Sequence, residues 1–162
     1  MVPEKEQGNL GADRLLLTEQ DIVRALGSDT HVRAEADAGP SAVGEVLRAA
    51  AVESAYRRFR GRLVVEDIER AVTISCLALV FDSEAVAEST FRQVAEAEHL
   101  RTRLEDVHVA VETVTAPSGL VSYWGYAHAG SVILVVTLDT VDPREVSVAE
   151  LRSILSVLVS RL

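Results

Sequence analysis

The sequence contains very little cysteine and very little lysine. Its 162 residues include one cysteine, Cys76, and one lysine, Lys5. A lone cysteine forms no intramolecular disulfide, so cysteine usage does not reveal the compartment. The net charge is -9, from 25 acidic against 16 basic residues. A sequence-independent hold on nucleic acid needs clustered Lys and Arg, so we do not expect nucleic-acid binding.

Sequence motifs for catalysis, cofactors and membrane insertion are also missing. No apolar run approaches the length of about twenty residues that crosses a bilayer. Neither a Gly-rich phosphate loop nor a G-x-S-x-G elbow occurs. We therefore expect no catalytic residue and no cofactor. The first residues, MVPEKEQGNLGAD, lack a hydrophobic signal region. We expect an extracytoplasmic location if a leader has been removed, and a cytoplasmic one if Met1 is the native start.

Two patterns contain metal-ligating residues, and we expect no metal at either. Glu96 and His99 form an E-x-x-H, which places a carboxylate and an imidazole on one helix face as di-iron bundles require. The further carboxylates of such a site are missing, so a solvated helix end is favoured. His108 and His128 lie on predicted strands and can meet across a sheet, but two histidines without a third ligand make a weak zinc site.

The apolar residues, 48% of the chain, suffice for the core of one domain. The stretch 120–138, LVSYWGYAHAGSVILVVTL, predicts a β-hairpin at the centre of an antiparallel sheet. Its second arm is aliphatic or β-branched at nearly every position, as in a strand covered on both faces. Gly130 fits the tight turn between the arms. Cys76 lies in another such run, ISCLALVF, so we expect a buried, unreactive thiol.

Periodicity and capping residues predict the remaining elements. We expect helices over 18–26, over 42–51, from Glu84 to about residue 100, and at the C-terminus after capping residues at Asp142 and Ser147. We expect strands over 70–81 and 107–114 beside the hairpin, with a brief extended piece at 31–34. Residues 51–61 either prolong the second helix or contain a strand at 56–59, and the strand is slightly favoured.

These elements together predict an α+β fold. The expected sheet is antiparallel, with about four or five strands and with helices packed mainly on one face. An amphipathic C-terminal helix lies across it, with its apolar stripe at Leu151, Ile154, Leu155, Leu158 and Leu162. Residues 1–13 are expected to form a flexible N-terminal arm, and residues 14–162 a single domain.

Three segments resemble a known family. They are LLLTEQDIVRALG at 15–27, ALVFDSEAVAESTF at 78–91, and the late hairpin AHAGSVILVV followed by a terminal amphipathic helix. With these segments, residues 15–162 resemble the small α+β domains of actinobacterial lipoproteins and extracytoplasmic sensor-type domains. The resemblance implies a binding or sensing module without catalysis. The chain departs from that family in having no lipobox.

Aromatic residues supply the candidate site. Trp124, Tyr126 and His128 fall on one face of the predicted hairpin because side chains alternate along a strand. Tyr56 and Phe59 are candidates to join them. Aromatic side chains with polar tips can line a mostly apolar pocket. They can equally form core beneath a helix, and the core interpretation is favoured because helices must cover one sheet face.

Three hypotheses for function follow. The leading one is a non-catalytic module that binds a small apolar ligand or a protein partner. The second is a small cofactor-free enzyme, such as a cyclase or isomerase of secondary metabolism, that positions a substrate in the aromatic pocket. The third is a structural dimerisation domain that forms a homodimer through a sheet edge or the C-terminal helix.

Overall fold

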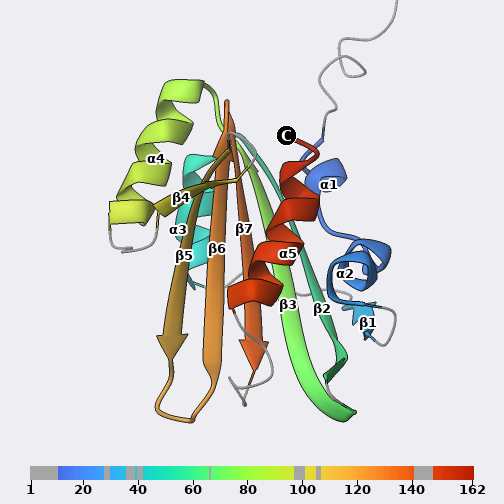
Figure 1. The fold of residues 1–162 in the computed structure, drawn as a ribbon. Helices are drawn as coiled ribbons and strands as arrows, with labels where there is room; N and C mark the ends of the chain where they lie inside the picture. Colours follow the sequence, from blue (N-terminus) through green and yellow to red (C-terminus); the bar gives the residue numbers. More distant parts are fainter. Residues whose placement is uncertain are drawn as a thin grey trace, which may run out of the picture.

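Seven antiparallel strands form one sheet in the part of the chain that the structure describes (Figure 1). The structure is a computed structural model, and it describes residues 11–27, 30–35, 39, 42–65, 67–96, 101–104, 107–140 and 148–162. The strands are β1 (His31–Ala34), β2 (Glu53–Val65), β3 (Ile68–Val80), β4 (Arg101–Leu104), β5 (Val107–Thr115), β6 (Val121–Ala129) and β7 (Val132–Thr140). Their order is β1-β2-β3-β7-β6-β5-β4, so β3 and β7 join an N-terminal and a C-terminal half.

Helices lie on both faces of the sheet. They are α1 (Ala12–Leu15), α2 (Glu19–Leu26), α3 (Ala42–Ala50), α4 (Glu84–Glu96) and α5 (Val148–Val159). Helix α5 crosses one face beside α1 and α2, whereas α3 and α4 lie against the other (Figure 1). Two separate clusters of buried side chains correspond to the two faces. We call the first the α5 face and the second the α4 face.

The α+β class and the antiparallel sheet are confirmed, but two details of the prediction are wrong. The sheet has more than the four or five strands expected, since β1 and β4 extend its edges. The extended piece predicted at 31–34 is β1, which pairs with β2. Strand β4 was not predicted, because its four residues are too few to show a clear alternation. Helices cover both faces rather than mainly one. The reason is the strand end from Leu77 to Phe81, which is apolar on both sides and so requires two covers.

Most of the predicted elements are confirmed. The hairpin is β6–β7, with Gly130 at a φ of 56° in its turn. Residues 51–61 contain a strand, because β2 pairs with β3 along its whole length. Helix α2 has the predicted capping box of Thr18 and Asp21 and ends at Gly27. Residues 1–10 of the predicted arm, the end of the fourth helix at 97–100 and the predicted caps at Asp142 and Ser147 lie outside the described residues.

Helix α5 carries the apolar stripe expected from the sequence. Four residues of the predicted stripe, Leu151, Ile154, Leu155 and Leu158, are fully buried in the α5 face. The predicted fifth member, Leu162, follows the end of the helix and is exposed. Beneath the stripe, a Cβ built on Gly125 of β6 would lie 2.7 Å from Leu155 Cδ1. The helix therefore packs directly against strand backbone.

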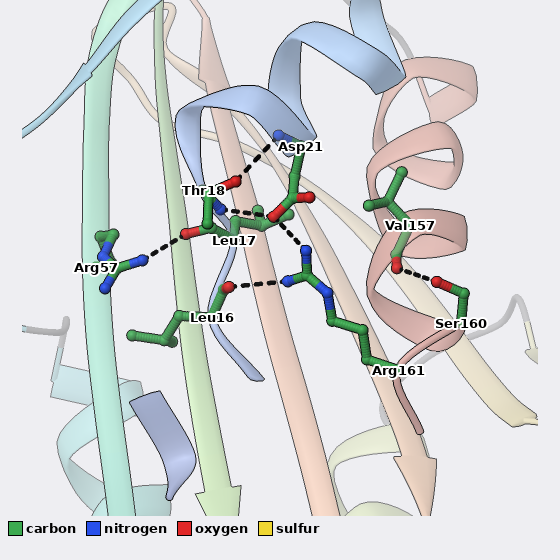
Figure 2. A network of polar contacts seen from close by, with 8 residues as sticks. All are labelled: Leu16, Leu17, Thr18, Asp21, Arg57, Val157, Ser160 and Arg161. Atoms are coloured by element: carbon green, nitrogen blue, oxygen red, sulfur yellow. Dashed lines mark hydrogen bonds and ion pairs between the residues drawn. The ribbon is translucent and has the colours of Figure 1, made fainter. Parts of the chain in front are cut away.

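A polar network at the end of α5 connects the two ends of the domain (Figure 2). Arg161 lies 2.5 Å from the Asp21 carboxylate and donates a hydrogen bond to the Leu16 carbonyl at 2.9 Å. Arg57 of β2 donates to the neighbouring Leu17 carbonyl at 2.8 Å. Burial raises the pKa of Asp21, but the hydrogen bonds from Arg161 and Thr18 outweigh burial, so this pKa lies below its ordinary value.

Arg161→Ala should destabilise the fold by about 3 kcal/mol, because it leaves the Asp21 carboxylate buried without its cation. Urea unfolding at pH 7 measures this change. Asp21 has a lowered pKa in the folded state, so its contribution is present above about pH 4 and is lost in acid. The difference between wild type and variant should therefore shrink below pH 4. Arg152→Ala, at an exposed position of α5, is the control, and an equal loss there would contradict the role of Arg161.

Cys76 is fully buried in the α5 face, as the sequence predicts. Burial raises the pKa of its thiol to about 12. The thiolate is the reactive form, so the native protein should not react with a disulfide reagent at pH 8, and the unfolded protein should react once. Stability should fall above about pH 9, where only the unfolded thiol ionises, by up to about 1.4 kcal/mol per pH unit. Rapid labelling of the native protein would contradict this burial.

Candidate functional site

The α4 face is divided into an apolar half and a polar half. On β3, the side chains of this face change along the strand from Thr73 and Ser75 to Leu77 and Leu79. Strand β7 changes in the same direction, because the register places Ser75 opposite Thr137 and Leu77 opposite Val135. Residues two apart share a face, so the two changes lie side by side across the sheet.

The apolar half is the part that α3 and α4 cover. Its buried cluster combines two helix residues of α4 with one of α3 and the ends of three strands: Leu47, Leu77, Leu79, Phe81, Ala87, Phe91, Tyr126, Ile133 and Val135. This half is core, and it places α4 over β6 and β7.

The polar half contains a hollow of about 450 Å³. We call it the sheet groove. Apart from Gly39, its lining comes from four adjacent strands: Tyr56 and Arg58 of β2, Thr73, Ser75 and Leu77 of β3, Val135, Thr137 and Asp139 of β7, and Ser122 and Trp124 of β6. No residue of a described helix contributes to it. The groove therefore lies across the β3–β7 junction, on strand surface beyond the reach of α3 and α4.

Hydroxyl groups and two charges form the floor of the groove. Ser75 and Thr137 share a hydrogen bond between their hydroxyl groups. The Ser122 hydroxyl donates to the Asp139 carboxylate at 2.5 Å. Arg58 forms an ion pair with Glu35, and this hydrogen bond raises the pKa of Arg58 above its ordinary value. The floor thus offers a fixed cation, a carboxylate and several hydroxyls to a bound molecule.

Two aromatic side chains line the groove where the polar half meets the core. Tyr56 and Trp124 are half-buried and pack against the cluster beneath α4. The Trp124 ring stacks on Tyr126, with centroids 6.3 Å apart and an interplanar angle of 25°. This contact fixes the indole at the boundary. A flat ligand that stacks on an aromatic ring would meet apolar and polar surface at once.

Tyr126 and His128 lie on the same face as Trp124, as expected, but under α4. They are 3% and 7% exposed. The Phe91 ring of α4 stacks on His128 at 5.3 Å, and His128 Nε2 lies 2.9 Å from the Gly130 carbonyl oxygen. Both residues are part of the core next to the groove and do not line it.

Phe59 lies on the opposite side of the sheet from the other four predicted site residues. It is 1% exposed and belongs to the cluster of the α5 face. The cause is the alternation of β2, which turns Tyr56 and Arg58 to one face and Phe59 to the other. The structure therefore brings together Tyr56, Trp124 and, behind them, Tyr126 and His128.

The polar residues of the groove were missed in the sequence analysis. Ser75 and Thr137 are single short polar residues in long apolar strands, and each is unremarkable alone. The signal that finds them is the polar-to-apolar change along one face of a strand, which marks where a cover ends. Asp139 of β7 and Ser122 of β6 are paired with each other, and they lie on the same face at the polar ends of their strands.

The described residues contain no group of three or more His, Cys, Asp or Glu that could hold a metal ion. His108 and His128 are directly opposite each other in the β5–β6 pairing, as the sequence suggested. His99 of the E-x-x-H pattern lies outside the described residues. Within the same described ranges, every helix is too short or too polar to span a bilayer.

No protein-family model matches this chain, and a search of curated proteins gives no significant match. Among solved structures, the chain is similar to the extracellular domain of PknH from Mycobacterium tuberculosis. The TM-score is 0.49 and the sequence identity 8%, over 92% of this chain and 93% of that chain. This is a weak structural resemblance, and no residue role is carried over from that domain.

Proposed function

We propose that this chain is a non-catalytic binding module whose small-molecule ligand occupies the sheet groove. The observation that carries the proposal is the change from apolar to polar side chains at the place where the helices of the α4 face end. A folded domain gains no core stability from hydroxyls and charges in the middle of a sheet. Such residues beside half-buried aromatics are typical of a site with a few orienting polar groups.

The composition of the groove favours a ligand with one flat apolar face and a hydrogen-bonding edge. Trp124 and Tyr56 would contact the flat face. Thr137, Ser75 and Asp139 would bind the edge. This ligand is less apolar than the sequence suggested, because polar residues of β3 and β7 lie between Tyr56 and Trp124. A volume of about 450 Å³ suits a small molecule rather than a protein surface.

The two other hypotheses have weaker support. Catalysis has no motif in the sequence to support it. Dimerisation through the C-terminal helix would need its apolar stripe at the surface, and that stripe is buried against its own sheet. A binding module requires neither a catalytic motif nor an exposed apolar stripe on the C-terminal helix.

Native mass spectrometry tests the proposal first. Protein purified under mild conditions should show a species heavier than 17.5 kDa that returns to this mass on denaturation. Trp124→Leu should lose the added mass, because it removes the stacking ring but keeps apolar cover over Tyr126. Tyr123→Phe, at a buried position on the other face of the same strand, is the matched control and should retain it.

If the protein is isolated empty, fluorescence of the single tryptophan gives the second test. An anilinonaphthalene sulfonate dye, which combines a flat ring system with an anion, should quench Trp124 in a saturable manner. The double change Ser75→Ala and Thr137→Val removes both hydroxyls of the floor and should weaken binding about tenfold, or about 1.4 kcal/mol. Binding that is equal in all variants, or absent altogether, would contradict the proposed site.

A further inference from the structure

A second hollow, of about 1060 Å³, lies at the β1 edge of the sheet. It is bounded by α2 and by the first two strands, which lie together at one side of the molecule (Figure 1). We call it the edge groove. It shares no lining residue with the sheet groove. The function proposed above therefore does not depend on it.

Positive charge is concentrated in the edge groove of an otherwise acidic chain. Arg24 of α2, Arg33 of β1, and Arg60 and Arg62 of β2 all line it, and all four are exposed. The strand register adds to this concentration, because it places Arg33 opposite Arg60. Basic side chains directly opposite one another destabilise a strand pair. An anion bound between them would relieve that repulsion.

Acidic residues neutralise this groove only in part. Arg60 pairs with Glu35 at 3.0 Å and Arg62 with Glu69 at 3.0 Å. Glu19 also lines the groove, where its carboxylate accepts a hydrogen bond from the Ala34 amide at 3.0 Å and adds one negative charge beside the four arginines. Arg24 and Arg33 form no ion pair with any residue that the structure describes. Two guanidinium groups are thus available to a ligand without breaking an existing pair.

An unsatisfied hydroxyl lies in the same lining. Thr30 is 3% exposed, and within the described ranges its Oγ1 has no hydrogen-bond partner. Buried polar atoms without a partner are rare, and each calls for a specific explanation. The Oγ1 atom itself is covered, so a ligand oxygen in the edge groove would bond to it only once the Thr30 side chain turns toward the groove. The arginines point to an anionic ligand, and the Thr30 hydroxyl is a neighbouring group that such a ligand would recruit.

We propose that the edge groove binds a phosphate-bearing ligand. The planar guanidinium of arginine donates two parallel hydrogen bonds to phosphate oxygens. A phosphate group has more acceptor oxygens than a single carboxylate, so it can bind several of the four arginines at once. The volume of the groove exceeds that of one phosphate ion, so it has room for a ligand with several phosphates or for a phosphate ester on a larger body. A soluble metabolite and an anionic lipid headgroup share this chemistry.

Calorimetric titration of the full chain with inositol hexakisphosphate tests the site. We expect saturable binding to one site per chain. The double variant Arg24→Gln and Arg33→Gln should weaken it at least tenfold. Thr30→Val, which keeps the side-chain shape, should weaken it about threefold without lowering the melting temperature. The control is Arg92→Gln, an exposed arginine of α4 that lines neither groove, which should bind like wild type.

Co-sedimentation with phosphatidylglycerol vesicles, against phosphatidylcholine vesicles, distinguishes the two sources. Binding to the soluble probe alone supports a soluble phosphorylated ligand, and binding to the anionic vesicles that the Arg24 and Arg33 changes abolish supports a headgroup. No binding to either probe would overturn the proposal. Equal weakening by Arg92→Gln would also overturn it, since the attraction would then be general. Neither result bears on the sheet groove, whose reporter is Trp124.

Discussion

The packing of α5 against Gly125 is the contact on which the rest of the fold depends. A side chain at this position would lie 2.7 Å from Leu155 and 3.2 Å from Leu151. Glycine lets the helix approach the strand backbone this closely without displacing the Leu155 side chain. This approach buries the apolar stripe of α5 completely, and it carries Arg161 to the Asp21 carboxylate at the start of α2. The two ends of the domain are thus closed over one face of the sheet.

Because the α5 face is fully covered, the α4 face does not need to be apolar and covered along its whole length. The α5 cluster extends from Ala12 to Val159 and contains most of the buried apolar side chains among the described residues. Burial of each large aliphatic side chain stabilises by about 1.5 to 3 kcal/mol, so this face can supply much of the stability of the fold. The α4 face needs cover only over its apolar half. Its polar half can hold Arg58, Asp139 and the hydroxyl pair at a cost that the other face offsets.

The sequence predicted the elements whose signal is local. The β6–β7 hairpin, the capping box of Thr18 and the stripe of α5 are each readable within about fifteen residues. Strand β4 was missed because its four residues, RTRL, carry no alternation. The groove was missed for a different reason. Ser75 and Thr137 are 62 residues apart, and only the pairing of β3 with β7 makes them neighbours. Trp124 and Tyr56 were predicted as candidates because aromatic residues with polar tips can be recognised in the sequence without knowledge of the strand pairing.

The shortness of the two edge strands has a consequence for self-association. An edge strand offers unpaired amide and carbonyl groups to other chains, and long flat edges lead to aggregation. In the described part of the sheet, β1 and β4 each present only four residues. On β1 the amide of Ala34 already donates a hydrogen bond to the Glu19 carboxylate, and Arg33 places a charged side chain on this edge. A sheet with such ends is a poor template for another strand. The domain can therefore keep half of one face open to solvent without joining its neighbours edge to edge.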